Sequence, residues 1–69
     1  MISDLCNRIL ERPNAVDLKT LIEEIKRVGS LDLNIDDSRF VMQIISNDDV
    51  AEEYSDLLEE LINVTLFVD

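Results

Sequence analysis

The sequence contains no histidine and only one glycine in 69 residues. It offers no Gly-rich loop, and no serine or cysteine stands beside a recognisable base, so the parts for nucleophilic catalysis or for cradling a phosphate are missing. Carboxylates are plentiful, but we expect most of them on an exposed helix face, where burial does not tune them for general acid–base chemistry. We therefore expect a protein without enzymatic activity and without a cofactor.

The chain has a single cysteine, Cys6, and it has no long apolar segment. One cysteine cannot form an internal disulfide, which suits a reducing compartment. Cys6 falls among apolar residues at helical spacing, so a buried structural thiol is the favoured interpretation. Because the N-terminus shows no cationic stretch followed by an apolar run, we expect a cytoplasmic protein.

Glycine and proline occur once each, while 46% of the residues are hydrophobic. This composition is too apolar and too poor in helix breakers for a disordered acidic tail. We expect one folded domain, residues 1–69. A domain of this size buries only about 60% of its unfolded surface, so oligomerisation would add to a small core.

Basic residues are scarce and unevenly placed. The sequence has sixteen acidic and six basic residues, for a formal net charge of −10. Every Lys and Arg lies at or before Arg39, and from Phe40 onward there are eight acids and no base. The negative charge disfavours nucleic acids and anionic membranes as direct ligands.

Two helices are expected in the first half of the chain. Apolar residues recur at i, i+3, i+4 and i+7 from Ile2, which predicts a helix from about residue 3 to residue 12, ended by Pro13. Asn14 is a suitable N-cap for a second helix, with Asp17 three residues later, and Gly29 is a natural stop.

Three strands are expected after Gly29. Leu31, Leu33 and Ile35 alternate with polar residues, which predicts a half-buried strand over 31–36. A turn at 36–38 leads to a second strand over 39–45, and the β-rich run 64–68 predicts a third. The expected fold is therefore α+β, in the order α-α-β-β-α-β, with a three-stranded antiparallel sheet covered on one face by helices. An unpaired terminal edge strand favours a homodimer, and its expected interface residues are Val64, Leu66, Phe67 and Val68.

The stretch 46–63 gives the clearest helix and the strongest clue to function. On a helical wheel its apolar residues fall on one side: Val50, Tyr54, Leu57, Leu58, Leu61 and Ile62. Its acids fall on the other: Asp48, Asp49, Glu52, Glu53, Asp56, Glu59 and Glu60. Like charges at i,i+4 are mildly destabilising, so the sequence accepts repulsion to keep this face anionic. Seven charges over about 18 Å exceed half the linear charge density of duplex DNA, roughly one per 1.7 Å.

In size, net charge and the segment DDVAEEYSDLLEE, the chain resembles the small acidic DNA-mimic proteins encoded by bacteriophages. The resemblance implies a protein that occupies the DNA-binding surface of a basic host protein, with an HU-type nucleoid-associated protein as the first expectation. It would act in the host cytoplasm by inhibition rather than catalysis. Asp32, Asp36 and Asp37, expected in a hairpin, could extend the acidic row.

Two other interpretations stay open. In one, the protein is an acidic interaction module whose partner does not bind DNA, and apolar contacts dominate the affinity. In the other, Asp37-Ser38 followed by Met42, Gln43, Ile44 and Ile45 resembles the phosphopantetheine attachment segment of acyl carrier proteins. That resemblance implies that Ser38 carries the prosthetic arm and that residues 39–46 are helical.

A metal site is not expected. Asp32, Asn34 and Asp36 match the opening of a calcium-binding loop, but Asp37 stands at the sixth position, where glycine is required. Gln43 stands at the twelfth position in place of the bidentate glutamate. Polar residues alternating on the exposed side of a strand explain this spacing better.

Overall fold

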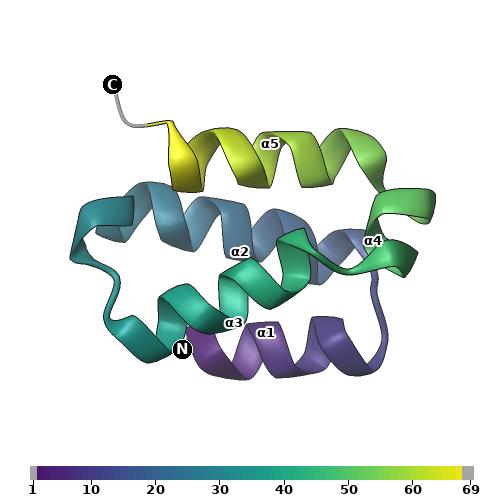
Figure 1. Cartoon of the computed structure of the whole chain (residues 1–69), viewed down its shortest axis with the longest axis horizontal. Helices are drawn as coiled ribbons and strands as arrows, with labels where there is room; N and C mark the ends of the chain where they lie inside the picture. Colours follow the sequence, from purple (N-terminus) through teal and green to yellow (C-terminus); the bar gives the residue numbers. More distant parts are fainter. Residues whose placement is uncertain (1, 68–69) are drawn as a thin grey trace.

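The protein is described here by a computed structural model that covers residues 2–67 (Figure 1). These residues form α-helices joined by short connections, with one 3₁₀ helix, η1. The elements are α1 Ile2–Glu11, α2 Ala15–Val28, η1 Ser30–Asp32, α3 Ile35–Ile45, α4 Asp48–Glu53 and α5 Ser55–Leu66. None of these helices is of the length and apolar character that crossing a membrane requires.

Helix α2 lies between α1 and α5 and packs against both (Figure 1). Helix α3 packs mainly on α1, and the short α4 closes one end of the molecule between α3 and α5. The molecule measures 27 × 22 × 19 Å along its principal axes.

The core is made entirely of apolar side chains, each contributed at helical spacing. Buried positions in α1 and α2 follow the i, i+3, i+4, i+7 pattern, which puts one stripe of each helix against its neighbours. The buried residues are Ile2, Leu5, Cys6, Ile9, Leu18, Leu21, Ile22, Ile25, Val41, Ile44, Val50, Leu58 and Leu61. No polar or charged residue is buried among residues 2–67.

The two N-terminal helices confirm the sequence prediction, including their ends. The Asn14 side chain accepts a hydrogen bond from the Asp17 backbone N–H at 2.8 Å and caps α2. Gly29 ends α2 with a φ of 93°, and its N–H donates to the Ile25 carbonyl oxygen at 2.7 Å.

The α+β prediction is wrong, because the described residues contain no strand. The expected strand over 31–36 is instead η1 followed by the start of α3. Asn34 caps α3, with its side-chain oxygen accepting from the Asp37 N–H at 2.8 Å. Asp36 and Asp37 then occupy the first turn, where negative charge is favourable. The residues interpreted as a turn are thus a helix start.

The second and third expected strands are also helical. In α3, Val41 and Ile44 are buried while Phe40 and Ile45 are half-buried, so the apolar run packs at a helical and not a strand spacing. Helix α5 continues through the β-branched residues near its end because Val64 packs on the core. Tertiary packing overrides their weak preference for strands.

The dimer predicted from a sheet edge loses its basis, since no edge strand exists in residues 2–67. Val64 faces the core, whereas Leu66 and Phe67 are 52% and 68% exposed. Val68, the fourth expected interface residue, lies outside the described residues.

The expected helix over 46–63 is two helices. Tyr54, with φ −133° and ψ 46°, separates α4 from α5. Its half-buried side chain packs on the core, and its hydroxyl lies 3.5 Å from the Pro13 carbonyl oxygen in the α1–α2 connection. Because of this break, Glu52 and Asp56 lie on different helices, so they do not repel each other as an i,i+4 pair of one helix would.

Candidate partner-binding surface

Helix α4 presents acids from its first residue. Asn47 caps it, accepting a hydrogen bond from the Val50 N–H at 3.1 Å, and buried Val50 anchors it to the core. Asp48 and Asp49 lie in the first turn, where the helix dipole favours negative charge. The local sequence therefore fixes this short helix while its acidic side chains remain in solvent.

Helix α5 continues the acidic surface beyond Tyr54. Its buried Leu58 and Leu61 pack on the core and turn the acids on the opposite side outward. All seven acids predicted for this region are exposed: Asp48, Asp49, Glu52, Glu53, Asp56, Glu59 and Glu60. We call these seven residues the acidic surface. The prediction of their exposure is confirmed, although a bend replaces the single straight row.

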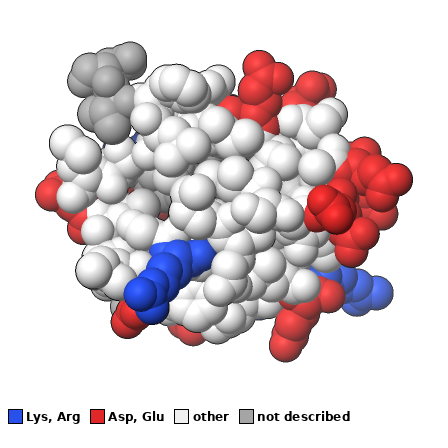
Figure 2. Space-filling view, viewed as in Figure 1, with Lys and Arg blue, Asp and Glu red and all other residues white. Residues whose placement is uncertain are grey.

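The acidic surface is almost free of compensating cations. Among residues 2–67, only Glu60 of the seven forms an ion pair, with Lys26 of α2 at 3.5 Å, and Lys26 is shared with Glu23 at the same distance. The other ion pairs are Arg8–Asp17 and Arg27–Glu24. Figure 2 shows acids gathered at the end of the molecule where α4 lies and along the side where α5 runs.

The three acids expected in a hairpin do not join the acidic surface. Asp32 lies in η1, and Asp36 and Asp37 lie in the first turn of α3. Helix α3, about 16 Å long at 1.5 Å per residue, separates them from α4. The residues that matched a calcium loop therefore start a helix, and the described residues include no group of three acids or cysteines placed to hold a metal ion.

An apolar groove on α3 was missed by the sequence analysis. It is shallow and open, has a volume of about 570 Å³, and is lined only by residues of α3 and its C-cap: Ile35, Ser38, Arg39, Met42, Gln43 and Ser46. Ile35 is 71% exposed and Met42 is 43% exposed. A helical wheel over residues 35–46 shows this face, but the predicted turn and strand place the same residues differently.

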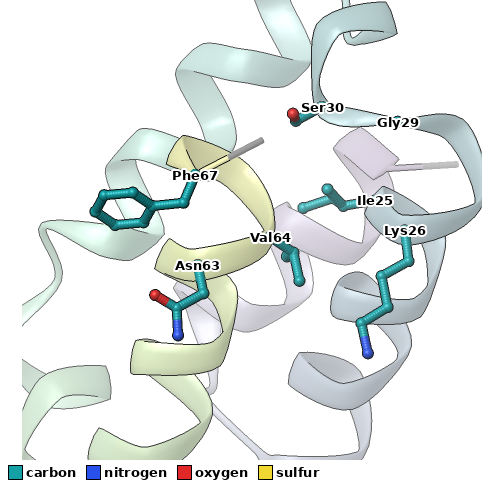
Figure 3. Close-up of a pocket in the computed structure, with 7 residues that line it drawn as sticks. All are labelled: Ile25, Lys26, Gly29, Ser30, Asn63, Val64 and Phe67. Carbon is teal, nitrogen blue, oxygen red and sulfur yellow. The ribbon is translucent and has the colours of Figure 1, made fainter. Parts of the chain in front are cut away.

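A second hollow lies between the C-terminal ends of α2 and α5 (Figure 3). Its volume is about 520 Å³, and it is lined by Ile25, Lys26, Gly29, Ser30, Asn63, Val64 and Phe67. The side chains of Ile25 and Val64 approach each other, while the ring of Phe67 points away from them. Its one charged group, Lys26, is already engaged by Glu23 and Glu60.

The remaining predicted positions are Cys6 and Ser38. Cys6 is fully buried, as expected. Burial, and to a lesser degree the nearby charge of Asp37, raises the pKa of its thiol from 9.0 to about 12. Ser38 is half-buried in the first turn of α3, and its N–H donates to the Asn34 carbonyl oxygen at 2.9 Å. The chain matches no family model, no curated protein and no solved structure.

Proposed function

We propose that this protein binds a basic DNA-binding protein through the acidic surface and there takes the place of DNA. The observation that carries the proposal is the state of the seven acids: all are exposed, and six have no ion-pair partner among residues 2–67. No buried polar contact depends on them. The fold thus holds them in position with most of their charge uncompensated.

The chemistry of such a partner is fixed by its normal ligand. A DNA-binding surface carries Lys and Arg arranged to meet phosphates, and carboxylates accept the same charge-assisted hydrogen bonds. The proposed class is that of the small acidic DNA mimics encoded by bacteriophages, which bind without catalysis. An HU-type nucleoid protein in the host cytoplasm is the first candidate partner.

The charge of the whole molecule suits this role. A duplex as long as the protein's 27 Å axis would carry about 16 phosphate charges, at one per ~1.7 Å. The protein carries a net charge of −10, a little over half of that value. Asp and Glu carry their charge on short side chains, so the partner's long Lys and Arg side chains must extend toward them.

A gel-shift competition tests the proposal. DNA bound to a purified HU-type protein is titrated with this protein at low and at physiological salt, and heparin serves as a bulk polyanion control. We expect free DNA to appear at near-stoichiometric amounts of protein, and direct binding of the protein to HU to weaken at the higher salt. Absence of release at both salt concentrations would remove HU as the partner.

Matched variants test whether the acidic surface is responsible. Glu52→Gln with Glu59→Gln neutralises one acid on α4 and one on α5. Asp4→Asn with Asp32→Asn makes the same change, from −10 to −8, at exposed positions outside the acidic surface. We expect the first pair to weaken competition about tenfold, roughly 1.4 kcal/mol, and the second to leave it nearly unchanged. Equal weakening by both would point to net charge alone.

A second candidate function has one observation in its favour. Residues 39–45 are helical, as the resemblance to acyl carrier proteins requires, and Ser38 lies in the first turn of that helix. Incubation with coenzyme A and a phosphopantetheinyl transferase tests this function. A phosphopantetheine mass increment that Ser38→Ala abolishes would support a carrier role, and no increment would exclude it for that transferase.

We also propose that two copies act together, so that the dimer presents two acidic surfaces as a duplex presents two backbones. Leu66 and Phe67 are exposed beside each other at the end of α5 and can supply the apolar contact. Sedimentation equilibrium should give a dimer that Leu66→Ser with Phe67→Ser dissociates. A monomer at all concentrations would limit the binding unit to one chain.

A further inference from the structure

The outward side of α3 is chemically unlike the rest of the surface. The molecule carries sixteen acids, yet the groove residues Ile35, Ser38, Arg39, Met42, Gln43 and Ser46 include none. The groove side is opposite to buried Val41 and Ile44 and would ordinarily be charged. Figure 2 shows this face as largely uncharged, with one basic side chain across it.

Acids lie near both ends of the groove in the sequence. Asp36, exposed in the first turn of α3, follows directly after Ile35. At the other end, Ser46 lines the groove and Asp48 and Asp49 begin α4 two and three residues later. The groove itself spans 11 residue rises, or about 16 Å, which corresponds to three turns of an opposing helix.

Arg39 lies between these acidic ends and restricts what can bind. It is exposed and forms no ion pair with any residue of the range 2–67. A basic residue placed opposite Arg39 would be repelled, whereas an apolar residue can pack on its aliphatic stem. From Ile35 onward the exposed charges are negative at Asp36, positive at Arg39 and negative again at Asp48 and Asp49 in α4, and Met42 lies between Arg39 and the acids of α4.

We propose that the α3 groove docks an amphipathic helix of the basic partner, with apolar residues in its middle and Lys or Arg at both ends. The apolar residues, spaced i, i+4 and i+7, contact Ile35 and Met42. The terminal cations meet Asp36 at one end and Asp48 and Asp49 at the other. This inference rests on the proposed function, because the helix belongs to the same basic partner that contacts the acidic surface.

The two contacts have different physical roles. Exposed acids attract a basic partner at long range, and that attraction is weakened by salt. Burial of Ile35 and Met42 under a partner helix is insensitive to salt and excludes other polycations that lack an apolar stripe. The groove would therefore provide a selectivity among basic partners that carboxylates alone cannot provide.

A synthetic helical peptide provides the probe. It carries two Lys at each end and three Leu at i, i+4 and i+7 between them, and its control has the same composition with Lys and Leu interleaved. We expect the designed peptide to bind with at least tenfold higher affinity by fluorescence anisotropy. Amide NMR shifts should concentrate on residues 35–46. Equal binding of both peptides would overturn the proposal.

Protein variants test the groove directly. Ile35→Ser with Met42→Ser should weaken binding of the designed peptide at least tenfold. Val16→Ser is the matched control, since Val16 is 73% exposed on α2 outside the groove, and it should bind like the unaltered protein. All three positions are exposed, so circular dichroism should remain unchanged. A groove variant that binds the peptide normally would overturn the proposal.

The competition assay separates failure of this inference from failure of the proposed function. If the groove variant still releases DNA from the partner as well as the unaltered protein does, the acidic surface suffices and the groove proposal is wrong. If the unaltered protein releases no DNA from HU but binds the designed peptide through the groove, HU is removed as the partner and the groove proposal stands. Self-association that the groove variant abolishes would assign the groove to a second copy and also overturn the proposal.

Discussion

At the scale of single residues, Cys6 shows how burial controls chemistry. Its side chain is fully buried between α1 and its neighbours. Burial, with a contribution from Asp37, raises the pKa of the thiol to about 12. Because only the thiolate reacts readily, Cys6 should be inert to a thiol reagent such as DTNB at pH 8 in the folded protein and should react at once in urea. Rapid reaction without denaturant would contradict the packing of α1.

The same shift predicts a pH dependence of stability. The folded pKa of Cys6 lies above its ordinary value of 9.0, so its protonated form is favoured by folding. The stabilisation is complete below pH 9 and is lost as the pH rises toward 12. Urea unfolding from pH 8 to 11 should show the free energy of unfolding fall more steeply for the unaltered protein than for Cys6→Ala. Equal pH dependence of the free energy of unfolding in the two proteins would show that folding does not change the pKa of the Cys6 thiol.

Residue-level features were the part of the site that sequence could predict. The exposure of Glu52 and its neighbours and the burial of Cys6 follow from helical spacing and charge alone. The exposure of Ile35 could not be predicted in the same way, since it depends on whether α3 is a helix or a strand. The acidic surface was therefore predicted and the groove was not.

At the scale of elements, the caps decide the fold. Asn14, Asn34 and Asn47 each accept a hydrogen bond from the N–H three residues later, at the starts of α2, α3 and α4. The first cap can be predicted from the sequence because an apolar helical stripe follows it. The cap at Asn34 is hidden by the alternation of Leu31, Leu33 and Ile35, which predicts a strand, although Leu31 and Ile35 are 83% and 71% exposed. Alternation without burial carries no information about strands.

The cap of α3 can be tested by Asn34→Ala. This change leaves the N–H of Asp37 without its side-chain partner and should lower the free energy of unfolding by about 1 kcal/mol. Asn7→Ala, at an exposed position inside α1, is the control and should change stability by less than about 0.5 kcal/mol. Equal effects of the two changes in urea titrations would mean that the α3 cap contributes nothing.

Gly29 makes the turn between α2 and η1 possible. Its φ of 93° is strained for any other residue, whereas an added Cβ would meet Asp32 Oδ2 only at an ordinary 3.6 Å. Gly29→Ala should therefore cost about 1–3 kcal/mol through backbone strain rather than through a clash. Adding Asp32→Ala, which removes the neighbouring carboxylate, should not relieve that cost. Recovery of stability in the double variant would assign the cost to contact with Asp32.

At the scale of the whole molecule, the net charge of −10 acts on folding and on binding in opposite directions. The molecule measures 27 × 22 × 19 Å, so most pairs of charges lie within the Debye length of about 30 Å at 0.01 M salt. At 0.1 M the Debye length falls to about 10 Å, and repulsion across the molecule is screened. Added KCl should therefore stabilise the fold, whereas it should weaken the binding of any partner held by the acidic surface.

Two measurements on the same samples check this opposition of signs. The urea midpoint should rise between 0.01 M and 0.1 M KCl, and it should rise less for either matched pair, Glu52→Gln with Glu59→Gln or Asp4→Asn with Asp32→Asn, because both remove two charges. Direct binding of the basic partner should weaken over the same salt range, and only the pair on the acidic surface should reduce that weakening. Folding thus responds to the number of charges and binding to their position. If binding depended on salt equally for the two pairs of variants, the partner would respond to the total charge and not to the arrangement of acids on α4 and α5.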